Sequence, residues 1–375
     1  MNALEGRKVI CCVGSGGVGK TTTSAALALK AAVEGKRALV LTIDPARRLA
    51  NSLGLRSLGN QETRIEAAHF ARADLVPRGE MWAMMLDLKR TWDQLVQRSA
   101  RSPEQAQAIL ENKIYQTLST AMAGSLEYMA MEKVYELHSS GKYDVLVLDT
   151  PPTSNALDFL HAPDRILDVL DNNAMRLVLG PMLKAGRVGF RLLAAPSSLV
   201  LRTLARFTGS DFLRDLAAFM LAFEGMYEGF KERAARVKEL LTSPEAGFVL
   251  VTSPNPLTTQ EALFFHRALE SDRIRTAAVV VNRVQRDPRR HGGPDSIEGL
   301  REALQLAQLK DENNFAERLC QTLTEQAILA DQDRREVDRL RDTLRRVPLF
   351  TVPRLRKDVH DLAGLWQIVE SLGGD

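Results

Sequence analysis

The chain has 375 residues, of which 45% are hydrophobic and 26% charged, and its formal net charge is +3. These values are ordinary for a globular enzyme, and so small a net charge predicts no nucleic-acid partner. The three cysteines (Cys11, Cys12 and Cys320) include no C-x-x-C pair, so we expect a reducing compartment and no structural zinc site. Because the first apolar run begins at residue 8, we expect no signal peptide and a cytoplasmic location. The sequence has no run of 18 apolar residues, so we do not expect an integral membrane protein.

Short runs of β-branched and aliphatic residues predict strands that are buried on both faces. They lie at 8–13, 37–43, 144–148, 247–252, 276–281 and 347–352. Helical patterns separate these runs. We therefore predict an α/β fold with a parallel, doubly wound sheet that binds ligands at the carboxyl ends of its strands.

Two intervals are too long for simple crossovers between strands. Residues 75–140 and 155–243 have helical patterns rich in methionine, and we predict that they form an inserted α-helical subdomain. Residues 297–345 have the charge pattern of surface helices. The predicted core then comprises residues 1–74, 141–154 and 244–375.

A glycine-rich loop follows the first predicted strand. It reads Gly14-Ser15-Gly16-Gly17-Val18-Gly19-Lys20-Thr21 and fits the pattern G-x-x-x-x-G-K-[ST]. Glycines let the backbone fold around phosphate oxygens, and Thr22 continues into a predicted helix whose N-terminus favours an anion. Lys20 is expected to reach the β- and γ-phosphates of a nucleotide, and Thr21 to bind Mg²⁺. This P-loop motif predicts a nucleotide-binding site, and residues 14–22 are its predicted nucleotide-binding segment.

Three polar residues follow other predicted strands. Asp149 has the Walker B position for Mg²⁺, with a turn cap as the alternative. Asp44 lies where a carboxylate can orient or deprotonate the attacking water. It is equally consistent with a helix cap before Pro45, and the spacing of the residues does not distinguish these two roles. Asn282 has the donor and acceptor that an adenine edge requires, and a turn asparagine is equally consistent with the sequence.

Together these elements resemble the ArsA-type ATPases, which include arsenite-pump ATPases and the GET-pathway ATPases that target tail-anchored membrane proteins. The resemblance lies in Gly16–Thr22, Asp44-Pro45-Ala46, Asp149–Thr153, Val281-Asn282-Arg283 and 352–362, and Glu127–Lys133 adds a likeness to bacterial members. It implies a dimer that closes over two ATP molecules. Asp44 and Lys20 would be catalytic, Asp149 would hold Mg²⁺, Asn282 would contact adenine, and Pro353 and Arg354 would lie in a loop against the base.

The sequence departs from the family pattern at several places. Ser15 replaces the signature lysine that reaches the other subunit's phosphates. The usual D-T-A-P-T-G-H-T reads Asp149-Thr150-Pro151-Pro152-Thr153-Ser154-Asn155-Ala156, with an added proline and a lost glycine. The dimer-bridging C-x-x-C is absent, and no cysteine lies near the helical region, which argues against arsenite binding.

Three functions remain open from the sequence. The first is an ATP-driven dimeric switch that binds and releases a client, including hydrophobic or membrane-protein segments. The second is the energising subunit of an anion or metalloid export system. The third is an ATP-binding regulatory subunit of a mixed dimer, with weak hydrolysis of its own because Ser15 replaces lysine. The partner is thus a second copy or a paralogous ATPase.

The helical region offers two candidate contact surfaces. An apolar stripe at 211–230 is predicted to pack in the core or to line a groove for an apolar peptide. Residues 172–210 contain five arginines and one lysine but no acidic residue. They are predicted to form a mobile lid, to contact an anionic membrane, or to lie on a solvated helix face.

Overall fold

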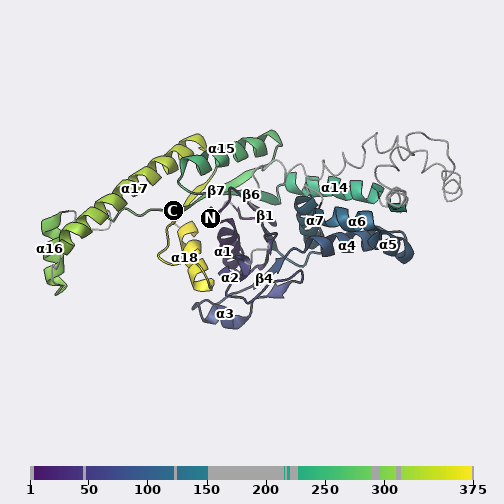
Figure 1. The fold of residues 1–375 in the computed structure, drawn as a ribbon, viewed down its shortest axis with the longest axis horizontal. Helices are drawn as coiled ribbons and strands as arrows, with labels where there is room; N and C mark the ends of the chain where they lie inside the picture. Colours follow the sequence, from purple (N-terminus) through teal and green to yellow (C-terminus); the bar gives the residue numbers. More distant parts are fainter. Residues whose placement is uncertain are drawn as a thin grey trace.

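The computed structural model describes residues 4–44, 48–121, 125–150, 227–288, 296–309 and 314–373, together with residues 215, 218 and 219. An eight-stranded sheet forms its centre (Figure 1). Only β3 and β4 pair antiparallel among the described strands, and every other neighbouring pair is parallel. The order across the sheet is β3 (Thr63–Arg64), β4 (Glu80–Met85), β2 (Arg37–Thr42), β5 (Val145–Asp149), β1 (Val9–Val13), β6 (Ala246–Thr252), β7 (Thr276–Val284) and β8 (Leu349–Pro353).

The predicted α/β class and all six predicted strands are confirmed. The strands are β1, β2, β5, β6, β7 and β8, and their ends differ from the predicted ones by at most about three residues. Every residue of β1, β5 and β6 is buried. Continuous aliphatic runs signal this burial because both faces of a parallel sheet are covered by helices.

Strand β4 corrects one expectation. We assigned residues 80–85 to the helical region that was predicted to begin at residue 75, but they pair with β2 over its whole length. Met81 and Met84 are fully buried in the two cores, one on each face of the sheet. Methionine favours helices in isolation, and here its burial beside β2 outweighs that preference. The two-residue β3 was also not predicted.

Helices cover both faces of the sheet. One layer packs on the face that contains Cys12 and consists of α1 (Lys20–Val33), α2 (Arg48–Ser52), α3 (Ala67–Ala71) and α18 (Leu362–Gly373). The other packs on the face that contains Cys11 and consists of α4 (Leu88–Ser99), α5 (Pro103–Leu110), α6 (Lys113–Ala121), α7 (Ser125–Ser139), α14 (Tyr227–Thr242), α15 (Pro256–Ser271) and the end of α17 (Phe315–Thr343). The two cysteines thus point to opposite faces of β1, as their adjacency in a strand predicts.

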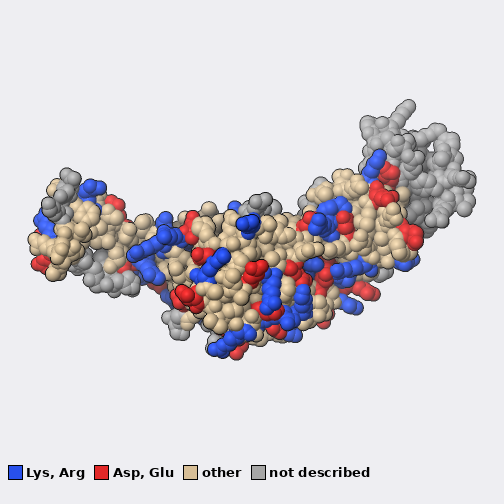
Figure 2. All heavy atoms as spheres, turned by 90° about the horizontal axis from the view of Figure 1, so that it is seen from below, with Lys and Arg blue, Asp and Glu red and all other residues tan. Residues whose placement is uncertain are grey.

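Helices also extend beyond the sheet at two opposite ends of the molecule (Figure 1). Helices α4 to α7 and α14 gather at one end, which places helical structure where the insertions were predicted. At the other end, α17 extends away from the sheet and carries α16 (Ile297–Leu306), as expected for surface helices in 297–345. The face drawn in Figure 2 carries acidic and basic side chains side by side. Within the described ranges, no helix has both the length and the hydropathy required to cross a bilayer.

Several expectations fall outside the described residues. They concern the turn at 151–156 and the basic segment 172–210. Of the apolar stripe at 211–230, the side chains of Phe219 and Phe230 are described, and both are buried in the core. For these two positions the structure agrees with core packing.

Candidate nucleotide-binding site

The glycine-rich loop joins β1 to α1 at the carboxyl edge of the sheet. Gly14 has a φ of +152°, and a Cβ there would lie 2.0 Å from the carbonyl oxygen of Val251 in β6. Gly19 has a φ of +98°, and a Cβ there would lie 2.1 Å from Nδ2 of Asn282 in β7. Only glycine fits at these two positions, because the loop runs directly against the ends of two strands.

The N-terminus of α1 is suited to an anion. Gly19 is its N-cap and supplies no side-chain hydrogen bond, so no side chain occupies the acceptor position at the helix start. Lys20 is buried, and its Nζ donates to the carbonyl oxygens of Gly14 and Ser15, each at 2.8 Å. Burial lowers the pKa of Lys20, while the Asp149 carboxylate acts in the opposite direction. A buried cation that faces loop carbonyls is poised to exchange them for phosphate oxygens.

The two candidate carboxylates lie at the ends of neighbouring strands. Thr42, the last residue of β2, pairs in register with Asp149, the last residue of β5. Its Oγ1 donates to Oδ2 of Asp149 at 2.8 Å and accepts from the backbone N–H of Asp44 at 3.2 Å. Oδ2 of Asp44 lies 3.5 Å from Nη1 of Arg48. Thr42 therefore links the two carboxylate residues, a role that sequence reasoning missed because it depends on strand register.

Asp149 has the properties of a carboxylate ligand for a metal cation. Its Oδ1 is buried and has no hydrogen-bond partner among the described residues. Burial raises its pKa from 3.8 to about 6, with the hydroxyls of Thr21 and Thr42 and the ammonium of Lys20 acting in the opposite direction. Mg²⁺ prefers carboxylate and hydroxyl oxygens, so the unpaired Oδ1 beside Thr21 fits this ion.

Asn282 and the residues after β8 surround one cavity. It has a volume of about 400 Å³, and Gly19, Thr22, Asn282, Pro353 and Arg354 are among its lining residues. The structure thus brings the predicted base-contacting residues together at the start of α1. Both polar atoms of the Asn282 side chain already make hydrogen bonds. Nδ2 donates to the carbonyl oxygen of Val18 at 2.8 Å, and Oδ1 accepts from the N–H of Arg283 at 2.9 Å. Asn282 therefore braces the loop, and its contact with adenine stays a prediction.

The side chain of Ser15 contacts helix α15. Its Oγ donates a hydrogen bond to Oε2 of Glu261 in α15. The sequence offered no signal for this contact, because 246 residues separate the two positions. Thr150, the residue after β5, donates a hydrogen bond from its hydroxyl to the carbonyl oxygen of Cys12 at 2.8 Å.

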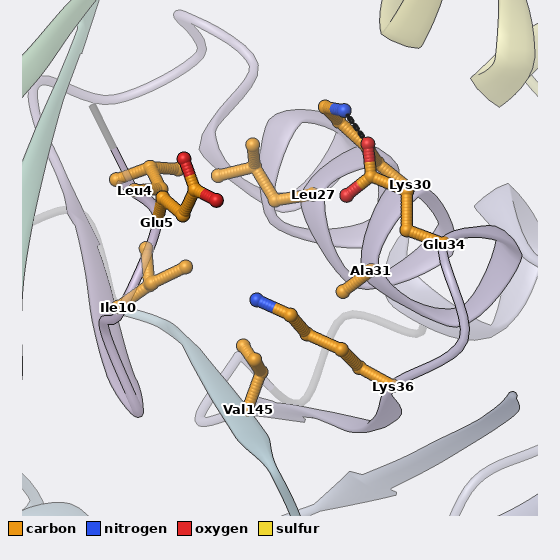
Figure 3. Close-up of a pocket in the computed structure, with 9 residues that line it drawn as sticks. All are labelled: Leu4, Glu5, Ile10, Leu27, Lys30, Ala31, Glu34, Lys36 and Val145. Atoms are coloured by element: carbon orange, nitrogen blue, oxygen red, sulfur yellow. Dashed lines mark hydrogen bonds and ion pairs between the residues drawn. The ribbon is translucent and has the colours of Figure 1, made fainter. Parts of the chain in front are cut away.

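A second cavity lies away from these residues (Figure 3). Its volume is about 320 Å³, and it opens between the last turns of α1 and the starts of β1 and β5. Aliphatic side chains and Lys36, whose side chain points toward the centre, line this cavity, and the Lys30–Glu34 ion pair lies beside it (Figure 3). Because it is at the amino ends of the strands, it is separate from the phosphate loop.

The fold and the site together define the class of protein. A buried strand, a glycine-rich loop with a buried lysine, an uncapped helix N-terminus and a buried carboxylate at the end of the neighbouring strand are the parts that a P-loop NTPase requires, and Asp149 stays the predicted Walker B residue. Residues 7–323 match the family model described as "Anion-transporting ATPase", and the chain therefore belongs to the ArsA-type ATPase family. This confirms the predicted family, and hydrolysis of ATP by this chain stays a prediction.

Three relatives illustrate the similarity. The chain is 34% identical over 159 residues to a protein named as an arsenical pump-driving ATPase from Prosthecochloris vibrioformis, a match that covers 42% of this chain and 36% of that relative. It is 31% identical over 176 residues to "ATPase GET3" of Malassezia globosa, covering 47% and 48%. It is 28% identical over 274 residues to "ATPase get3" of Aspergillus terreus, covering 72% and 71%. The matches to the first two relatives thus span less than half of those proteins.

Proposed function

We propose that this chain is a Mg²⁺-dependent ATPase that acts as a dimeric switch, binding and releasing a client as ATP is bound and hydrolysed. The observation that carries the proposal is the unpaired, buried Oδ1 of Asp149, which lies at the same sheet edge as Lys20 and Asp44. A buried carboxylate that is costly to ionise is retained where a cation compensates it.

Each residue has a distinct part in the proposed reaction. Lys20 leaves the carbonyls of Gly14 and Ser15 and binds the β- and γ-phosphates, while the N-terminus of α1 supplies backbone N–H donors. Thr21 and Asp149 hold Mg²⁺, which neutralises developing charge on the phosphates when it is bound. Asp44 orients the attacking water and accepts its proton, and Thr42 holds Asp44 in place through its backbone N–H.

The client part of the proposal rests on the resemblance to GET-pathway ATPases. Of the helices that gather beside the sheet, α7 and α14 lead into the amino ends of β5 and β6. Asp149 is at the carboxyl end of β5, so in this proposal the strand itself connects the Mg²⁺ site to these helices. We favour this switch over metalloid export, because Cys11 and Cys12 are fully buried on opposite faces of β1 and Cys320 lies on α17.

The test is an Asp44→Asn variant of the full chain. Asparagine keeps the shape of aspartate and loses the base, so the variant is expected to bind ATP with wild-type affinity and to turn over at least about a hundredfold more slowly. Nucleotide titration and phosphate release measure the two effects. Hydrolysis at the wild-type rate would contradict the assignment of Asp44. Proteins retained on this variant with ATP, but not with ADP, then identify the client. Arsenite that stimulates the wild-type enzyme several-fold would instead favour export.

A further inference from the structure

The first two residues of the phosphate loop are attached to one structural unit, the β6–α15 segment. Gly14 packs so closely on the carbonyl of Val251 that no side chain fits between them. Ser15 is held from two sides: its carbonyl oxygen accepts from Nζ of Lys20 at 2.8 Å, and its hydroxyl donates to the carboxylate of Glu261. The conformation of the loop at Ser15 therefore depends on α15.

Helix α15 is a firm support for this contact. Its N-cap, Asn255, accepts from the N–H of Leu257 at 2.9 Å, and Pro256 occupies the first turn. Thr259 donates to Glu336 of α17 at 2.9 Å, and Phe265 is buried against the sheet. Glu261 lies between these anchored residues on the exposed side of the helix. Its carboxylate is thus presented to Ser15 by a rigid element, which is what a positioning residue requires.

We propose that Glu261 is a positioning residue for ATP binding, acting through its hydrogen bond to Ser15. The inference rests on the proposed function, since it assumes that the loop binds ATP. The hydrogen bond holds the Ser15 side chain on α15 while its carbonyl accepts from Lys20, so the loop is already shaped when phosphates replace that carbonyl. The negative charge of Glu261 is not required for this role, because an exposed charge is screened by salt.

A double-mutant cycle separates this role from others. In the full chain, Ser15→Ala and Glu261→Ala are each expected to weaken ATP binding by about three- to tenfold, and the double variant to be no weaker than either, because both remove one contact. Glu261→Gln keeps an acceptor for the Ser15 hydroxyl and should bind within about twofold of wild type. The loss should fall on KM, with kcat within about twofold, because a preorganised loop stabilises bound ATP and its transition state alike. Glu270→Ala, an exposed glutamate later in α15, is the control and should change neither value.

Other outcomes overturn the inference. Additive losses from Ser15→Ala and Glu261→Ala would show that the two side chains act separately. Tighter binding in Glu261→Gln would show that the charge repels ATP and that the hydrogen bond is unimportant. Unchanged affinity in both alanine variants, in a protein where Lys20→Ala abolishes binding, would remove the role of Glu261 and leave the proposed function intact. Failure of the wild type to bind ATP would instead remove both.

Discussion

Replacement of Asp149 by asparagine is expected to stabilise the protein at neutral and alkaline pH. The carboxyl of Asp149 ionises with a pKa of about 6 in the fold, against an ordinary value of 3.8, because it is buried. The fold therefore favours the protonated form. The carboxyl therefore does not reduce stability below pH 3.8, where it is protonated in both the folded and the unfolded chain. Stability falls as the pH rises from 3.8 to about 6, because the unfolded chain ionises first. Asparagine is neutral at every pH and can keep the acceptor for the Thr42 hydroxyl.

The size of the effect follows from the two pKa values. Each tenfold change in an ionisation constant corresponds to about 1.4 kcal/mol, so moving the pKa from 3.8 to about 6 corresponds to about 3 kcal/mol. Asp149→Asn should raise the free energy of unfolding by roughly this amount at pH 8 and by well under about 1 kcal/mol at pH 4. Lys20 and Asp44 also face this carboxyl: the charge of Lys20 lowers its pKa and that of Asp44 raises it, and both effects are included in the value of about 6.

Urea unfolding of the wild type and the variant, without Mg²⁺ or nucleotide, measures the difference at both pH values. Asp342→Asn, at an exposed position of α17, is the matched control and should change stability by less than about 0.5 kcal/mol at either pH. With Mg²⁺ and ATP present the order should reverse, because only the aspartate holds the ion. A variant that is less stable than wild type at pH 8, or whose effect is equal at pH 4 and pH 8, would refute the reasoning.

Three further predictions concern the loop and the helical region. Lys20→Ala should weaken ATP binding at least about a hundredfold, because it removes the buried cation that faces the phosphates, and unchanged binding in a nucleotide titration would contradict the loop assignment. Ser15→Lys should raise the rate of single-turnover hydrolysis at saturating ATP about tenfold or more, because it supplies a cation near the phosphates, whereas the uncharged Ser15→Met should not raise it. No rise in the lysine variant would mean that another group already stabilises the phosphate charge. Arg233→Ala should lower the free energy of unfolding by about 3 kcal/mol, since it leaves the buried Glu132 carboxylate without its guanidinium partner, and a loss below about 1 kcal/mol in urea unfolding would show that the pair is dispensable.

Some features of the site were determined by the sequence alone. The phosphate loop was predictable because glycine, lysine and threonine at fixed spacing serve a backbone conformation that is local to residues 14–21. The six predicted strands were visible because burial on both faces requires continuous apolar runs. Asp44 and Asp149 could be placed at one edge of the sheet because parallel strands bring their carboxyl ends together.

Other features were decided only by the tertiary structure. Strand β4 has a composition that is also typical of helices, and only its pairing with β2 makes it a strand. The hydrogen bonds from Thr42 to Asp149, from Ser15 to Glu261 and from Asn282 to Val18 join residues that are 107, 246 and 264 positions apart. Such contacts depend on strand order and register, to which packing of the whole core contributes, and no local pattern of residues encodes them. The sequence therefore identifies the groups that are predicted to face ATP, and the fold determines which side chains hold those groups in place.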